Sequence, residues 1–212
     1  MFRDRAEAGR RLGEALAAAP PSDPLVLGIP RGGVVMAAEV AAALHAPLDV
    51  VVTRKIGAPG NAELAVGAIA PGVQVWDRDL LEHLGVDTAY LRAAIDEQER
   101  ELARRSRAYR GSRPAPDTTG RTAIVVDDGL ATGSTALAAV RWARAAGARR
   151  VIVAVPVAAV QAVGLLAREA DEVHAIETPA SFRAVGEWYD DFTQTTDDEV
   201  VRALERAAED GG

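Results

Sequence analysis

The chain has 212 residues, of which 49% are hydrophobic and 26% are charged, enough for one well-buried core with an appendage. Its net charge of −7 argues against a broad surface for nucleic acid or for an anionic membrane, because both need clustered Lys and Arg. The absence of cysteine excludes disulfides and thiolate chemistry.

The first half of the chain alternates apolar segments with helical ones. The N-terminal sequence is charged and helical, unlike a signal peptide, and no apolar run reaches membrane-spanning length. We therefore expect a cytoplasmic protein that makes no membrane contact. The pattern predicts, in chain order, a helix over 4–18, a strand over 25–29, a helix over 34–46, a strand over 48–53, a loop over 54–61, a hairpin over 63–76 and helical residues over 78–110.

The second half continues the alternation after a loop. Gly147 is predicted to cap a helix, and Thr196 with Glu199 forms a capping-box pattern at the start of the last one. The predicted elements are a loop over 111–120, a strand over 123–128, a helix over 134–147, a strand over 149–158, a helix over 161–170, a strand over 171–177, an irregular aromatic stretch over 178–192 and a helix over 197–209.

Strands that alternate with helices favour an α/β fold, with a doubly wound, mostly parallel sheet. We expect a single domain over residues 1–212. Its core spans about 20–176 and carries a helical insertion at about 78–118. A small hood at about 177–196 and the terminal helices complete it.

Polar clusters follow three of the predicted strands. They are RGG at 31–33, RKIG at 54–57 and DDGLATGST at 127–135. Because doubly wound sheets bind ligands at the carboxyl ends of their strands, we expect these clusters to form one pocket. Lys55 is the only lysine among 24 basic residues, and it offers a compact charge that arginine does not copy. We therefore assign it to the site, although a solvated loop lysine is the simpler alternative.

The segment AIVVDDGLATGSTA at 123–136 runs from a strand through a turn into a helix. It has neither the GxxxxGK[ST] pattern nor the GxGxxG pattern of known phosphate loops. Backbone N–H groups at a helix start nevertheless favour an anion. The amides and hydroxyls predicted to hold a phosphate belong to Ala131, Thr132, Gly133, Ser134 and Thr135.

Asp127 and Asp128 precede this turn, where carboxylates would repel a phosphate placed directly on them. A carboxylate pair one step back can instead accept hydrogen bonds from a vicinal diol. Phosphate at one end and two hydroxyls at the other describe a ribose 5-phosphate. Two alternatives stay open: the acids merely end a strand and cap a helix, or they form the metal site of a receiver-like domain, which would carry such a pair at its first strand.

Residues 124–136 resemble the signature that binds 5-phosphoribosyl pyrophosphate (PRPP) in type I phosphoribosyltransferases. Their part VVDDGLATGSTA is especially similar to the version in the adenine enzymes. PRGG at 30–33 resembles the pyrophosphate loop of that family, which binds through backbone N–H groups and often contains a cis peptide, for which a glycine would be suitable. RKIG resembles the start of the flexible catalytic loop, and PASFRAVGEWYDDF at 179–192 resembles the hood of the 6-oxopurine enzymes. The layout as a whole is similar to a bacterial subgroup of the family.

The resemblance implies transfer of the 5-phosphoribosyl group of PRPP to a small acceptor, a nitrogen heterocycle, with release of pyrophosphate. It implies Mg²⁺ as cofactor, a homodimer, no nucleic-acid partner, and closure of residues 55–67 over the substrate. Catalytic roles fall to Asp127, Asp128, Lys55 and Arg31. The remaining implied residues are Gly32, Gly33, Arg54 and residues 131–135 for PRPP, Phe182 and Trp188 for the acceptor, and Asp127, Asp128 (through ribose or water) and Asp190 for the metal.

The chain departs from the family where the acceptor is read. Ala131 occupies the position of an acid in the 6-oxopurine enzymes, and no lysine lies in the hood strand. The acceptor therefore stays open, and the hood aromatics are equally consistent with a small satellite core. The alternative function is a non-catalytic regulator that senses PRPP or a nucleotide.

Overall fold

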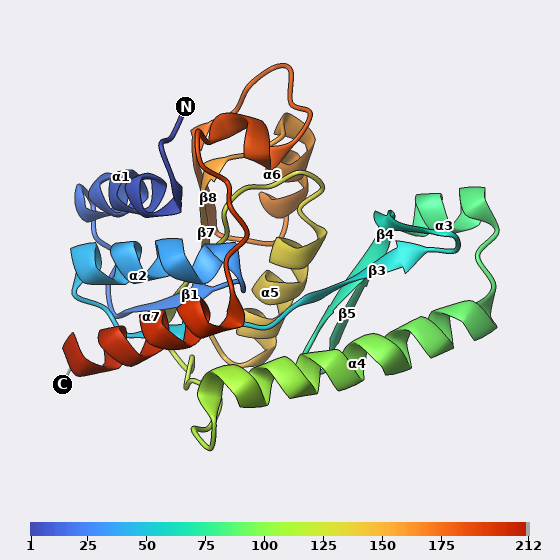
Figure 1. Cartoon of the computed structure of the whole chain (residues 1–212), viewed down its shortest axis with the longest axis horizontal. Coiled ribbons are helices and arrows are strands. Elements are labelled where there is room, and N and C mark those ends of the chain that lie inside the picture. The colour runs from blue at the N-terminus through green and yellow to red at the C-terminus, as the bar shows by residue number, and fades with distance from the viewer. Residues whose placement is uncertain (211–212) are drawn as a thin grey trace.

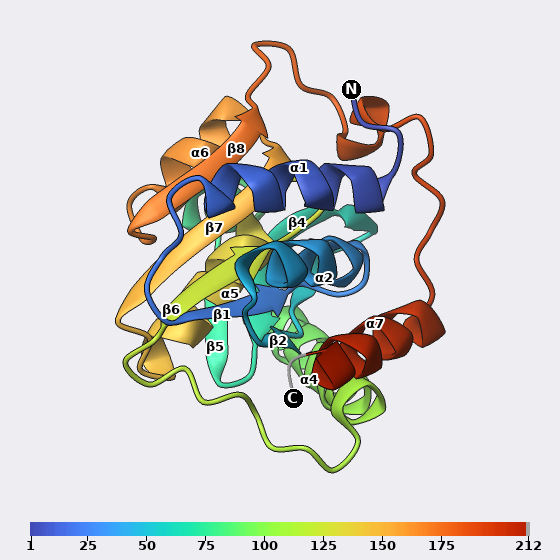
Figure 2. The same ribbon diagram turned by 90° about the vertical axis from the view of Figure 1, so that its left-hand side faces the viewer.

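The computed structural model describes residues 1–210, without the side chains of Glu63 and Asp210. Five parallel strands form the main sheet in the order β2-β1-β6-β7-β8, which Figure 2 shows from one side. Their bounds are Pro24–Gly28 (β1), Leu48–Val50 (β2), Thr122–Val126 (β6), Arg150–Val157 (β7) and Glu172–Glu177 (β8). The prediction of an α/β fold with a doubly wound, mostly parallel sheet is confirmed.

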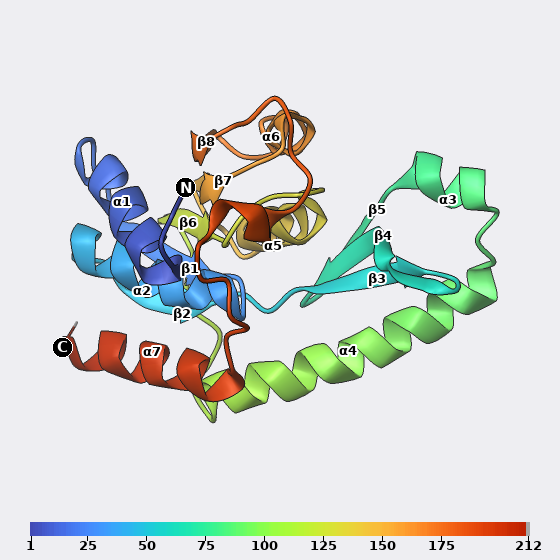
Figure 3. The same ribbon diagram turned by 45° about the horizontal axis from the view of Figure 1, so that its top comes forward.

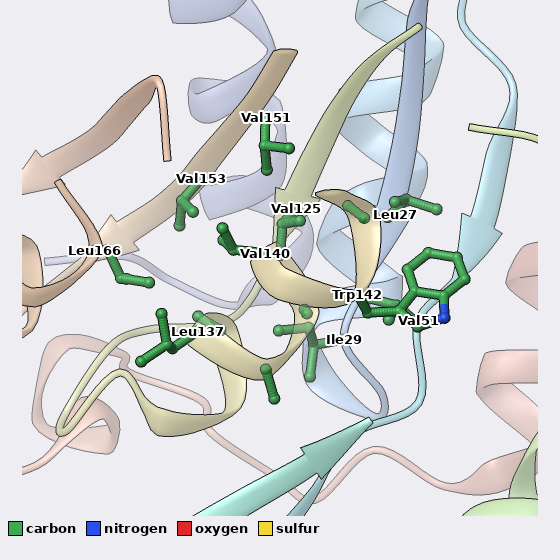
Figure 4. Packing of buried hydrophobic residues seen from close by; sticks show 14 of the residues in the cluster. Leu27, Ile29, Val51, Val125, Leu137, Val140, Trp142, Val151, Val153 and Leu166 are labelled. Carbon is green, nitrogen blue, oxygen red and sulfur yellow. The ribbon is translucent and has the colours of Figure 1, made fainter. Parts of the chain in front are cut away.

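Helices cover both faces of this sheet because its strands are apolar on both sides. The helices α1 (Arg5–Ala17) and α2 (Gly32–Leu44) pack on one face, where Val26 and Ile124 lie. The helices α5 (Ser134–Ala145) and α6 (Val160–Leu166) pack on the other. There Leu27, Val125 and Val153 meet α5 in the cluster of Figure 4.

A second, antiparallel sheet and the two helices that follow it project from the main sheet as an arm (Figures 1 and 3). Its strands are β3 (Arg54–Ala58), β4 (Asn61–Ala70) and β5 (Val73–Trp76), in the order β3-β4-β5. The helices α3 (Arg78–Leu84) and α4 (Thr88–Arg110) follow, with Gly85 ending α3 in the left-handed conformation. At the far end of α4, Arg110 Nε lies 2.9 Å from Asp49 Oδ1 and ties the arm to β2.

Two predictions for this region were wrong. Residues 54–58 form β3 rather than a loop, because Ile56 and Ala58 alternate into a buried face and pair with β4. The strand predicted over 48–53 ends at Val50, after which the chain leaves the main sheet for the arm. The helical prediction over 78–110 holds, with a break at Gly85 that makes two helices.

The C-terminal region closes back over the sheet. The hood contains a short 3₁₀ helix (Val185–Trp188), and α7 (Asp197–Asp210) packs on α2 and α4. The predicted capping box is confirmed, since Glu199 N donates to Thr196 Oγ1 and Thr196 N donates to Glu199 Oε2. Helix α5 ends at Ala145, with Gly147 in the left-handed region just beyond it. Among residues 1–210, no helix is both long and apolar enough to cross a membrane.

Candidate functional site

A cavity of about 740 Å³ opens at the point of the main sheet where the strand order reverses, between β1 and β6. The chain leaves β1 toward β2 on one side and returns as β6 on the other, so the crevice lies at the carboxyl ends of these strands. Loops of the core and of the hood contribute to its wall, together with residues of β3, β4 and α4. The predicted site residues in this wall are Arg31, Gly32, Arg54, Lys55, Asp127, Asp128, Ala131, Thr132, Gly133 and Thr135.

The RGG turn leads directly into α2. A cis peptide bond joins Pro30 to Arg31. The cis bond therefore precedes Arg31, and not one of the two glycines that we expected to favour it. A Cβ on Gly32 would lie 2.1 Å from Asp128 Oδ2, and one on Gly33 would lie 2.6 Å from the Val126 carbonyl oxygen. Only glycine therefore allows this turn to approach the end of β6.

The two acids sit side by side but differ in their partners. The Asp128 backbone N donates to Asp127 Oδ1 at 2.9 Å, and Arg5 Nε donates to Asp128 Oδ2 at 2.9 Å. Burial and then the Asp128 carboxylate raise the pKa of Asp127 well above its usual range. Burial also raises the pKa of Asp128, while the charge and hydrogen bond of Arg5 lower it. The positive charge near these two partly buried acids is therefore too small to keep their pKa values in the usual range.

The predicted phosphate turn is the start of α5. Gly133, at φ 78°, precedes the first helical residue Ser134, and Leu137 N donates to the Gly133 carbonyl at 2.8 Å. Ser134 N donates to Thr132 Oγ1 at 3.4 Å, which helps fix the turn. Leu130, just before the turn, forms an isolated parallel β-bridge with Ala158, which follows β7. This bridge fixes the start of the turn beside the end of β7. The helix start predicted from the sequence is confirmed, and residues of the turn line the same cavity as the acids.

Arg54 and Lys55 reach the cavity from β3. Arg54 Nε donates to Gln98 Oε1 of α4 at 2.9 Å, and burial, followed by the charge of Arg105, lowers the pKa of Arg54. Lys55 is exposed and pairs with Ala68 of β4. The Tyr90 hydroxyl donates to the Gly57 carbonyl at 2.9 Å, so α4 holds β3 at two points. The insertion therefore supports the cationic side of the cavity.

Five predicted residues lie outside the cavity wall. Gly33 and Ser134 are adjacent to wall residues, whereas the other three face elsewhere. Phe182 packs on the α5 side of the core, and Trp188 packs on the side of α1 and α2. Asp190 is exposed, and its backbone N donates to the Phe2 carbonyl. Within the described residues, no group of three or more His, Asp or Glu side chains is arranged to hold a metal.

The wall also contains residues that the sequence did not single out. The main ones are Arg5, Thr53, Gln98, Val185 and Gln194, and the wall also includes Phe192, one of the hood aromatics. Arg5 lies in an arginine-rich helix and Gln98 in a charged insertion, so no local pattern marks either. Thr53 follows β2, and its buried Oγ1 has no hydrogen-bond partner among the described residues.

Comparison with known proteins agrees with this geometry. The model of the phosphoribosyl transferase domain family matches residues 6–190. Relatives from two strains of Mycobacterium tuberculosis, each named "Putative phosphoribosyl transferase", are 49% identical over 211 residues. These matches cover 99% of this chain but 48% of each relative, so the chain spans about half the length of these relatives.

A solved structure, that of TT1426 from Thermus thermophilus, is 45% identical with a TM-score of 0.81. The alignment covers 97% of this chain and 98% of that one. The family match extends over most of the chain, from α1 through the sheet to the hood. The chain therefore belongs to the phosphoribosyltransferase family.

Proposed function

We propose that this protein transfers the 5-phosphoribosyl group of PRPP to a small nitrogen-heterocycle acceptor and releases pyrophosphate. One observation carries the proposal: a single cavity joins an anion-binding helix start, an acid pair and a lysine-bearing strand. These three groups match the phosphate, the ribose hydroxyls and the pyrophosphate of PRPP.

The start of α5 is the proposed seat of the 5-phosphate. The backbone N–H groups around Gly133 and Thr135 lie at the positive end of the helix dipole, which favours an anion. The hydroxyl of Thr132 lies in the same wall.

The acid pair is the proposed seat of the ribose. Asp127 Oδ2 and Asp128 Oδ1 have no side-chain partner among the described residues, which leaves one carboxylate oxygen of each acid for a hydroxyl. Hydroxyl donors stabilise the charged form of a carboxylate whose pKa burial has raised. The same negative charges favour the oxocarbenium-like state of the sugar, so catalysis rests on positioning and charge.

The cations at the other end of the cavity are the proposed seat of the pyrophosphate. Lys55 is exposed at the wall, and Arg31 Nη1 lies 4.0 Å from Asp197 Oδ1 of α7. This weak pair leaves the Arg31 guanidinium available to an anionic ligand. On the hood side, Val185 and Phe192 supply an apolar wall against which we place the acceptor.

The donor set of the cavity fits Mg²⁺. Asp127 and Asp128 provide carboxylate oxygens, which Mg²⁺ prefers. Residues 1–210 hold no larger cluster of acidic or histidine ligands, which fits an ion held largely by substrate and water. When bound, Mg²⁺ would neutralise charge on the leaving pyrophosphate. Asp190 lies outside the wall, and the proposal does not need it.

The test is pyrophosphate release from PRPP and Mg²⁺ across a panel of purine, pyrimidine and other heterocyclic bases. Release that depends on one acceptor is the expected result. Lys55→Ala should lower turnover at least about tenfold and leave the melting temperature nearly unchanged, because its side chain is exposed.

Arg78→Ala is the matched control, since it removes an exposed cation outside the cavity wall. PRPP binding without turnover on any base would overturn the transferase and support the sensing regulator. Absence of PRPP binding would overturn the transferase and a regulator that senses PRPP, and would leave a regulator that senses a nucleotide.

A further inference from the structure

Arg5, near the N-terminus, is a cation in the wall of the cavity. It opens α1 and lies 123 positions before its partner Asp128. Its side chain is 11% exposed, and that of Asp128 is 20% exposed. Because solvent screens a pair this deep only weakly, the interaction has the character of a buried ion pair.

The same guanidinium also holds the hood. Arg5 Nη1 donates to the Thr193 carbonyl at 2.7 Å, and Arg5 Cζ lies 3.9 Å from the centre of the Phe192 ring. The residues before Arg5 pair with the hood as well, since Phe2 N donates to the Trp188 carbonyl at 2.8 Å and Asp191 N donates to the Arg3 carbonyl at 2.8 Å. The N-terminal segment and the hood therefore form one unit, and Arg5 joins it to the acid pair.

Arg5 also determines which oxygen of Asp128 is free. The backbone N–H of Asp128 donates to Asp127 Oδ1, and Arg5 Nε donates to Asp128 Oδ2. Each carboxylate is thereby fixed through one oxygen and presents the other. Gly32 packs against the same contact, because a Cβ there would lie 2.5 Å from Arg5 Nε.

Building on the proposed function, we propose that Arg5 is a positioning residue of the PRPP site: it orients Asp128 toward the ribose, neutralises part of the negative charge of the acid pair, and holds the hood over the acceptor. PRPP is strongly anionic, so an acid pair without Arg5 repels it more. A hood without Arg5 loses its cation–π contact and one hydrogen bond to the core.

The experiment measures PRPP affinity with Mg²⁺ by calorimetry, and hydrogen exchange of residues 185–195, for Arg5→Gln and Arg5→Lys. Arg5→Gln should weaken PRPP binding about tenfold and speed exchange in the hood, because it removes a charged hydrogen bond. Arg5→Lys keeps the charge and should recover part of the affinity, but not the planar stacking on Phe192. Arg3→Gln is the matched control, since the Arg3 side chain is exposed and pairs with Asp4.

A double-mutant cycle with Asp128→Asn separates positioning from general damage. In the Asp128→Asn background, Arg5→Gln should change PRPP affinity by no more than about twofold. Equal losses in both backgrounds, or an Arg5→Gln protein that binds PRPP like wild type, would overturn the assignment. If Arg5→Gln does not fold, Arg5→Lys decides through the same cycle. A wild-type protein that does not bind PRPP overturns the proposed function, and the role of Arg5 with it, whereas failure of Arg5 alone leaves wild-type binding intact.

Discussion

Asp127 and Asp128 are neighbours in sequence with different electrostatic surroundings. Asp128 has Arg5 as an ion-pair partner, whereas Asp127 has a backbone amide and the adjacent carboxylate. Burial, and then Asp128, raise the pKa of Asp127 well above its usual range. A carboxylate retained under these conditions costs stability, which is common where function requires the charge.

We expect Asp127→Asn to stabilise the protein at neutral pH while it lowers PRPP turnover. A pKa that is higher in the folded than in the unfolded protein contributes stability below the unfolded pKa, and this contribution is lost as the pH rises through the folded pKa. The amide has no charge to bury and can still accept from the Asp128 N–H. The gain should be about 1 kcal/mol, measured by urea unfolding between acidic and neutral pH.

Asp128→Asn serves as the comparison, because it removes a charge but also breaks the pair with Arg5. It should gain less or lose stability. An Asp127→Asn protein that is less stable than wild type at neutral pH, with the same pH dependence, would contradict the electrostatic account.

The residues that the sequence could predict are those that directly follow a strand. Asp127 belongs to this group, because parallel strands bring their carboxyl ends to one edge. The same argument assigns Lys55 to the site, and Lys55 does line the cavity, but it does so from within β3 of the antiparallel sheet. Arg5 could not be found this way, since its role depends on the N-terminal segment folding against the hood. Phe182 and Trp188 show the converse: the resemblance of residues 179–192 to a hood segment suggested both aromatics, but it does not determine the direction in which each ring packs.

At the scale of elements, the start of α2 is the most constrained part of the site. Gly32 lies against both Asp128 and Arg5, so the turn, the acid pair and α1 meet at one point without room for a Cβ. The sequence predicts this turn because RGG separates an apolar strand from a helix. It does not predict β3, since the Gly and Pro residues after Lys55 are typical of a loop and the strand depends on pairing with β4.

Gly32→Ala should lower PRPP affinity at least about tenfold and destabilise the protein by about 1–3 kcal/mol. The added Cβ would lie 2.1 Å from Asp128 Oδ2, so the carboxylate or the turn must move. Calorimetry and urea unfolding measure the two effects. Gly164→Ala in α6 is the control, because its added Cβ meets nothing within 4 Å beyond the neighbouring residues and backbone of its own helix, and it should leave affinity unchanged. Normal PRPP binding by Gly32→Ala would show that the turn is not packed as described.

At the scale of the whole molecule, three separate parts enclose one cavity. The segments that follow β1 and β6 line one side of it, β3 and α4 contribute Lys55 and Gln98, and the hood contributes Val185 and Phe192. Strand and helix alternation was enough to predict the sheet, because that pattern is local. How the arm and the hood approach the sheet was not predictable, since α4, α7 and the N-terminal segment fix it through contacts distant in sequence.

The most direct test of the account is a crystal structure of the protein with PRPP and Mg²⁺. We predict that the 5-phosphate lies on the backbone N–H groups of residues 131–135 and that the ribose hydroxyls donate to Asp127 and Asp128. A phosphate bound elsewhere, with the turn before α5 empty and the acids turned away from the sugar, would contradict it.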